Sequence, residues 1–161
     1  MLRLSSLRRA LGRPFADWTA LAEAWSCLLA ADLALRLLPY RRVERLFGPA
    51  PASRPARPGA VSRSVWAAGA ASRHHLWPMR CLPHALCLRR LLARRGIEGV
   101  LRIGVAREGD RLLAHAWIEH EGRPLGEVEE SIARFAPLLG AEETDRAASL
   151  LSRLRPAHDD P

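Results

Sequence analysis

CLPHALCLRRLLARRGIEGVLRIGVAREGDRLLAHAWIE, residues 81–119, contains the clearest helix and the clearest hairpin of this chain. Residues 82–95 place apolar side chains at helical spacing. Pro83 fits the first turn of that helix, where its missing N–H costs nothing. Gly96 fits the position just after a helix ends. This part of the sequence therefore predicts one helix with a defined start and stop.

After Gly96 the apolar spacing changes from helical to alternating, which is typical of strands. Residues 100–106 and 111–119 both alternate, with a turn between them at 108–110. A second turn at 120–122 leads to a possible third strand at 123–128. Strands that follow one another with short turns form an antiparallel sheet. Helices first and a small antiparallel sheet afterwards predict an α+β fold.

The 161 residues divide by composition into three parts. The first part, 1–47, has a basic start followed by an apolar helical region over 16–47 that breaks near Pro39. The second part, 48–60, is a loop rich in proline. The third part, 61–161, contains a helix at 61–75, the stretch described above, an apolar FAPLLG segment and a charged helix at 141–153.

The net charge of +8 comes from 25 basic residues, all of them arginine. Most of these arginines are scattered and are not combined with aromatic residues into a base-stacking surface, so we do not expect a nucleic-acid partner. The three cysteines are too few and too scattered for a disulfide framework, which favours a reducing, cytoplasmic setting.

The most apolar stretch, Trp18 to Leu38, has about the length of a membrane-spanning helix. It contains Glu23, Asp32 and Arg36. Charged residues inside a segment of this length argue against a spanning helix and for an amphipathic one. We therefore expect no transmembrane segment, while contact with a membrane surface stays open.

Cys81 is the first candidate for chemistry. It precedes or begins the helix at 82–95, where free N–H groups and the positive end of the helix dipole favour a thiolate. A thiolate is what a cysteine nucleophile requires. The alternative is that Cys81 is a small buried apolar residue, as most free cysteines are. We assign the core role to Cys27 and Cys87.

His115 is the candidate base for such a nucleophile, and Glu127 is the candidate that orients it. If 120–122 form a three-residue loop with Gly122 in the left-handed position, His115 lies directly opposite Glu127. Side chains opposed in this way have Cβ atoms about 5 Å apart. A two-residue loop would shift the register by one residue and break the pairing, and Glu129 is the alternative acid.

Four pieces of this sequence resemble one family, the leader peptidases of lasso peptide biosynthesis, within the transglutaminase-like branch of the papain-like fold. They are WPMRCLPHAL, LLARRGIEGVLRIGVA, LLAHAWIEHEGRPLGE and FAPLLG, spread over about residues 61–140. The family pattern has a Pro before a Cys-Leu pair, then LLRRRGI, LxIGV and AHAWVE. Cys81, His115 and Glu127 match the family's nucleophile, base and acid. Pro83 and His84 depart from the pattern, and the acid is Glu where Asp is common.

The resemblance implies a cysteine peptidase that removes the leader from a ribosomally made precursor peptide. It implies two partners: a separate leader-recognition protein, because no strand is predicted before residue 100, and a lactam synthetase that closes the ring. It implies no cofactor. Trp77, Leu82 and Trp117 are candidates to line the pocket for the leader, although each also suits a core position. The backbone N–H of Cys81 is a candidate donor to the oxyanion.

Three alternatives use the same residues. A zinc site would draw on the histidines and cysteines between 74 and 87, but Cys81 and Cys87 lie about 120° apart around a helix and no CxxC pair is present. We therefore predict no metal. A non-catalytic module would bind a leader or partner through its basic surface. A transglutaminase-like acyl transferase would pass the acyl group to an amine in place of water, and the triad alone does not separate it from a peptidase.

Overall fold

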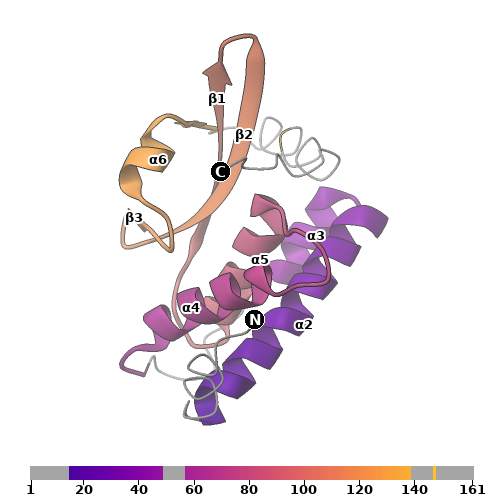
Figure 1. Ribbon diagram of the computed structural model, residues 1–161, viewed down its shortest axis with the longest axis vertical. Coiled ribbons are helices and arrows are strands. Elements are labelled where there is room, and N and C mark those ends of the chain that lie inside the picture. The colour runs from indigo at the N-terminus through magenta and orange to yellow at the C-terminus, as the bar shows by residue number, and fades with distance from the viewer. Residues whose placement is uncertain (1–14, 49–56, 139–146, 148–161) are drawn as a thin grey trace, which may run out of the picture.

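A computed structural model describes residues 15–48, 57–138 and 147 of this chain. Helices come first and a small antiparallel sheet follows, so the fold is α+β as predicted (Figure 1). The elements, in chain order, are α2 (Phe15–Leu37), α3 (Tyr40–Phe47), α4 (Ala60–Arg73), α5 (Cys81–Ala93), β1 (Val100–Glu108), β2 (Arg111–His120), β3 (Arg123–Pro124), α6 (Glu129–Ala133) and β4 (Ala136–Pro137).

The helices predicted at 16–47, 61–75 and 82–95 are confirmed to within two residues at each end. The apolar region 16–47 forms two helices, and the break falls where predicted, because α2 ends at Leu37 and α3 begins at Tyr40. Pro39 lies between them in an extended conformation, with φ −65° and ψ 144°. A proline in that conformation cannot continue the helix before it and is well placed to start the next one.

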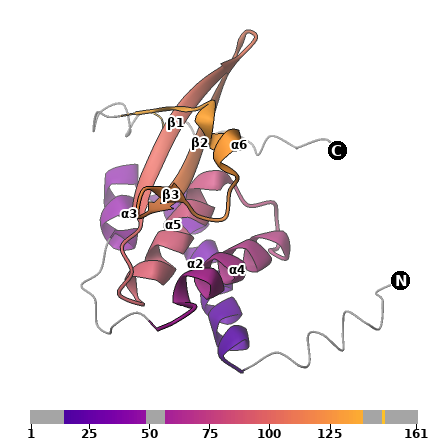
Figure 2. The same ribbon diagram turned by 90° about the vertical axis from the view of Figure 1, so that its left-hand side faces the viewer.

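Helix α5 lies at the centre of the core. Nine of its 13 residues are buried, which a helix shows when neighbours cover most of its circumference. Helices α2 and α4 pack against it, and Figure 2 shows these helices together below the sheet. Small side chains on α2 and α4, among them Ala24 and Ala67, are fully buried and let the backbones approach closely. One hydrophobic cluster thus joins elements on both sides of the proline-rich loop.

The sheet has four strands in the order β3-β2-β1-β4. The long hairpin of β1 and β2 is antiparallel from Val100 opposite Glu119 to Glu108 opposite Arg111. Its turn uses Gly109, whose φ of 58° favours glycine. In both views the tip of this hairpin extends away from the helices (Figures 1 and 2). The other end of the hairpin packs on α5.

The predicted register of the next hairpin is wrong by one residue. β2 pairs with β3 so that His120 lies opposite Arg123 and Glu119 opposite Pro124. The loop therefore has two residues, Glu121 and Gly122, with φ values of 51° and 76°. Two successive left-handed residues match the twist of a two-residue hairpin loop, so the loop closes earlier than the three-residue prediction. Strand β3 also ends at Pro124, well before the predicted residue 128.

Two short elements after β3 were not predicted. Helix α6 and strand β4 follow each other, and β4 pairs with β1 through Gly104 opposite Pro137 and Val105 opposite Ala136. The basic segment 1–14, most of the loop 48–60 and the helix at 141–153, Ala147 apart, lie outside the described residues. Within the described part of the chain, no helix combines the length and apolar character needed to cross a membrane.

Candidate active site

Cys81 is the first residue of α5, and its side chain is half-buried. The first backbone hydrogen bond of the helix is donated by the N–H of His84 to the carbonyl oxygen of Arg80, at 3.3 Å. The N–H groups of Cys81 and Leu82 come before that bond and are therefore left without an intrahelical acceptor. No acidic residue lies in this first turn. The sulfur thus lies at the positive end of the helix dipole.

His115 lies in the middle of β2, opposite Gly104 of β1. Its ring is flanked by two aromatic rings: Phe135 at a centroid distance of 5.2 Å and Trp117 at 6.0 Å. These contacts shield the imidazole from water on two sides and hold its orientation. Trp117 is fixed in turn, because its Nε1–H donates to Glu119 at 3.1 Å.

Gly104 makes this aromatic packing possible. A Cβ atom at position 104 would lie 2.9 Å from a ring carbon of Trp117, 3.0 Å from Cβ of Phe135 and 3.1 Å from the carbonyl oxygen of Ala136. A side chain here would push away both rings that flank His115, and strand β4 with them. The sequence shows Gly104 only as a residue of an alternating strand, so its role emerges from the packing alone.

Glu127 contacts His115 directly, although the predicted strand register is wrong. Both carboxylate oxygens lie 2.8–2.9 Å from Nε2 of His115. Glu127 reaches this position from a bend after β3, in which Gly126 has a φ of 77°. A Cβ atom at Gly126 would lie 3.1 Å from a methyl carbon of Val65, so α4 supports the bend from outside. The contact thus depends on the left-handed turn at Gly126 and not on strand pairing.

Two neighbouring residues, Cys81 and Glu127, raise the pKa of His115. Burial lowers it, but hydrogen bonds to Cys81 and to Glu127, together with the negative charge of Glu127, outweigh burial and raise the pKa to about 9. Both Glu127 oxygens lie at Nε2, so a thiol partner of this ring would use the other nitrogen, Nδ1. His115 is therefore protonated at neutral pH, with a carboxylate at Nε2 and the Cys81 thiol near the ring. This arrangement can activate a thiol and deliver a proton to a leaving group.

Glu129, the alternative acid, begins α6 and is exposed. Among the described residues, Glu127 is the acid that contacts His115.

A buried carboxylate on α2, Asp32, holds the segment that leads to Cys81. Only 2% of its side chain is exposed. It accepts hydrogen bonds from Arg80 at 3.1 Å, from Nε1 of Trp77 at 3.2 Å and from Arg36 at 2.7 Å. Arg80 immediately precedes Cys81, so these contacts tie the start of α5 to α2. In the sequence, Asp32 is visible only as a charge that argues against membrane insertion.

The three candidate substrate-binding residues occupy different places. Leu82 is fully buried in the core, so its side chain offers no surface to a substrate in this structure. Trp117 is 4% exposed and packs beside His115. Trp77 is partly exposed and donates to Asp32. Of the three, Trp77 has the most surface left for a ligand.

The other histidines and cysteines near the site do not gather around one point. Within residues 15–48, 57–138 and 147, no three His, Cys, Asp or Glu side chains are arranged to hold a metal ion. His75 stacks on Trp25 at 4.8 Å. Cys87 is fully buried, as predicted, and its thiol donates to the carbonyl oxygen of Ala24 at 3.5 Å.

His84 lies one turn after Cys81 on α5. Burial lowers its pKa below the ordinary value, and the charges of His115 and Arg73 lower it further, while Glu127 opposes them. The Nε2 atom of His84 is buried, and no described residue hydrogen-bonds to it. His84 is therefore a neutral imidazole beside a protonated one, which sequence spacing alone did not reveal.

The fold and the site together define a class. A cysteine begins the central helix, a histidine lies on the adjacent sheet, and a carboxylate contacts that histidine. The family model described as "Transglutaminase-like superfamily" matches residues 25–140, and this chain belongs to that superfamily, which includes cysteine peptidases. Neither the comparison with curated proteins nor the comparison with solved structures finds a match.

Proposed function

We propose that this protein is a cysteine peptidase that removes the leader from a ribosomally made lasso precursor peptide. The observation that carries the proposal is the carboxylate of Glu127 at Nε2 of His115, on a ring whose pKa the nearby Cys81 also raises, within a transglutaminase-like fold. The family-like motifs around these three residues support leader removal as the particular reaction. A separate leader-recognition protein would present the precursor, and a lactam synthetase would take the released core peptide.

In the proposed mechanism, the Cys81 thiolate attacks the scissile carbonyl carbon, and the carbonyl oxygen becomes an oxyanion. The free backbone N–H of Cys81 at the start of α5 is a donor for that oxyanion. The tetrahedral intermediate collapses as His115 gives its proton to the leaving amine, which frees the core peptide and leaves the leader as a thioester on the sulfur. Water then attacks the thioester while His115 accepts its proton. The leader leaves as a carboxylate and the starting state is restored.

Glu127 has a distinct task in this scheme. It receives the Nε2–H of His115 and stabilises the imidazolium in the states where the ring carries two protons. It also prevents the ring from rotating away from the sulfur. The flanking rings of Phe135 and Trp117 keep water from competing for these hydrogen bonds.

The test incubates the precursor peptide and the leader-recognition protein with wild type or with Cys81→Ala and follows leader release by mass spectrometry. The proposal expects release by wild type alone, with precursor binding retained in the variant. Cys27→Ala is the matched control, because it removes a cysteine outside the site and should leave release intact. Equal release by wild type and Cys81→Ala, or binding without release by either, would instead support the non-catalytic binding module.

A further inference from the structure

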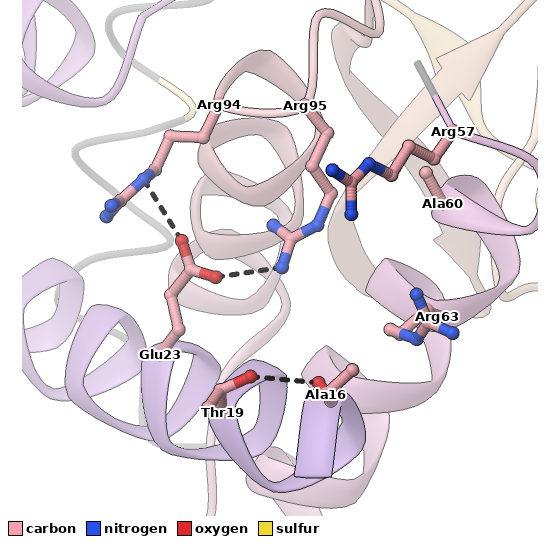
Figure 3. A pocket seen from close by; sticks show the side chains of 8 residues that line it. All are labelled: Ala16, Thr19, Glu23, Arg57, Ala60, Arg63, Arg94 and Arg95. Atoms are coloured by element: carbon pink, nitrogen blue, oxygen red, sulfur yellow. Dashed lines mark hydrogen bonds and ion pairs between the residues drawn. The ribbon is translucent and has the colours of Figure 1, made fainter. Parts of the chain in front are cut away.

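A hollow of about 390 Å³ lies between α2, α4 and α5, and four arginines line it: Arg57, Arg63, Arg94 and Arg95 (Figure 3). We call it the arginine pocket. Its volume falls in the range of about 300–1,000 Å³ that is typical of ligand sites. Arg94 and Arg95 follow the C-terminal end of α5, whereas Cys81 begins that helix. A 13-residue helix is about 20 Å long, so the pocket is separate from the candidate active site.

Two carboxylates already neutralise part of the pocket. Glu23 bridges Arg94 at 3.1 Å and Arg95 at 2.8 Å, as the dashed lines in Figure 3 show. Asp17 accepts a hydrogen bond from Arg63 at 3.0 Å. Among the described residues, the four guanidinium groups of the lining are thus offset by two carboxylates, Glu23 in the lining and Asp17 beside it, which leaves an excess of two positive charges.

Arg57 carries one of these excess charges. Among the described residues, its guanidinium has no ion-pair partner. Figure 3 shows its side chain extending toward the guanidinium of Arg95, which is only 22% exposed. Two like charges that face each other across one hollow repel, and the partial burial of Arg95 weakens the screening by water on its side. An anion between the two guanidinium groups would attract both of them and offset their mutual repulsion.

The start of α4 adds to the positive potential. Ala60, the first residue of this 14-residue helix, lines the pocket. The first turn of α4 contains no acidic residue, and no side chain caps its free N–H groups. The positive end of the helix dipole therefore lies beside a hollow that already has excess positive charge.

We propose that the arginine pocket binds the carboxylates of an acidic peptide segment belonging to a protein partner. The same arginines already hold the planar carboxylates of Glu23 and Asp17, so their geometry suits further Asp or Glu side chains. The arginines lie on different sides of the pocket, because Arg57 precedes α4 whereas Arg94 and Arg95 follow α5. Neighbouring carboxylates along a peptide can reach both sides, which one compact ion cannot do as well. This inference goes beyond the proposed peptidase function and does not rest on it.

The experiment uses the full chain carrying Cys81→Ala, so the outcome does not depend on cleavage. Fluorescein-labelled hexaglutamate is the probe, hexaglutamine is its uncharged match, and binding is followed by fluorescence anisotropy. We expect hexaglutamate to bind, hexaglutamine not to bind, and Arg57→Gln to weaken hexaglutamate binding about tenfold, since one charge-assisted hydrogen-bonding group is lost. Added salt should weaken binding in the parent protein.

Arg111→Gln is the control, because it removes the same charge from an exposed residue at the hairpin tip, far from the pocket. It should leave affinity within about twofold. Equal weakening by the two variants, or no binding of hexaglutamate, would overturn the proposal. Displacement of the probe by inorganic phosphate at similar concentration would also overturn it, since the pocket would then be a phosphate site. At one hexaglutamate concentration, the melting temperature should rise less in Arg57→Gln than in the parent, which gives a readout independent of the fluorophore.

Discussion

Glu127→Gln isolates the charge that supports His115. The His115 pKa of about 9 lies above the ordinary value of 6.5, and the difference corresponds to about 3 kcal/mol of preference for the imidazolium. The side chains of His115 and Glu127 are 24% and 25% exposed, so solvent screens only part of this interaction. Glutamine keeps the shape of the side chain but removes its charge. We expect the His115 pKa to fall by about 1–2 units, since an opposite charge in contact contributes about that much.

The sign of the stability change follows from the direction of the shift. A raised folded-state pKa contributes stability that is fully present below pH 6.5 and is lost as pH rises through about 9. Wild type should therefore lose stability across this window. Glu127→Gln should be less stable than wild type near pH 6, and the gap should narrow toward pH 9. Urea unfolding at a series of pH values measures this difference.

The pKa itself is measured by NMR titration of the imidazole Cε1–H signals, with the His115 signal assigned by its absence in His115→Asn. Glu129→Gln is the matched control, because it removes an exposed acid two residues away and should leave the His115 pKa in place. A wild-type His115 that titrates near 6.5 would refute the reasoning. An equal drop in Glu129→Gln would refute the assignment to Glu127.

Three further predictions follow from single positions. Gly104→Ala should destabilise the protein by about 1–3 kcal/mol, because the added methyl group overpacks the site. It should also weaken the NMR cross-peaks between the His115 ring and the rings that flank it. Unchanged stability would contradict the close contacts at this position. Asp32→Asn should cost about 3 kcal/mol in urea unfolding, because it breaks a buried ion pair with Arg80, and a loss under about 1 kcal/mol would show that the pair contributes little. Since the pKa of His84 is lowered in the fold, its protonation should cost stability as pH falls below about 6.5, and His84→Gln should abolish that acid-side loss.

Helices and the first hairpin were predictable because their signals are local. Proline at Pro39 and Pro83 and glycine at Gly96 mark the ends of helices, and the change from helical to alternating spacing marks the start of β1. These signals depend on a few neighbouring residues and need no knowledge of packing. The α+β class follows from their order along the chain.

The contact between His115 and Glu127 was predicted through a register that the structure contradicts. A loop of Glu121 and Gly122 and a loop of three residues satisfy the same turn signals, and the sequence does not choose between them. The acid reaches the histidine because Gly126 turns the chain back against α4. Such a bend is set by packing between distant segments, so local patterns do not contain it.

The remaining parts of the site were not predictable for the same physical reason. The support from Asp32 to Arg80 joins residues 48 positions apart, and the packing of Phe135 on His115 requires the short strand β4 to pair with β1. The Asp32–Arg80 contact and the packing of Phe135 on His115 both join distant segments, and the local sequence of each segment gives no sign of the contact. In the same way, Arg57, Arg63 and Arg95 are scattered in sequence, and the fold brings them to one pocket.

The most direct test of the proposed peptidase mechanism is cleavage of the precursor peptide in water enriched in heavy oxygen, followed by mass spectrometry of the released leader. Hydrolysis through a Cys81 thioester predicts one heavy oxygen in the new C-terminal carboxylate of the leader, with no product from Cys81→Ala. A leader released without heavy oxygen and joined to an amine would show acyl transfer in place of hydrolysis. A labelled leader formed equally well by Cys81→Ala would contradict the thiol mechanism itself.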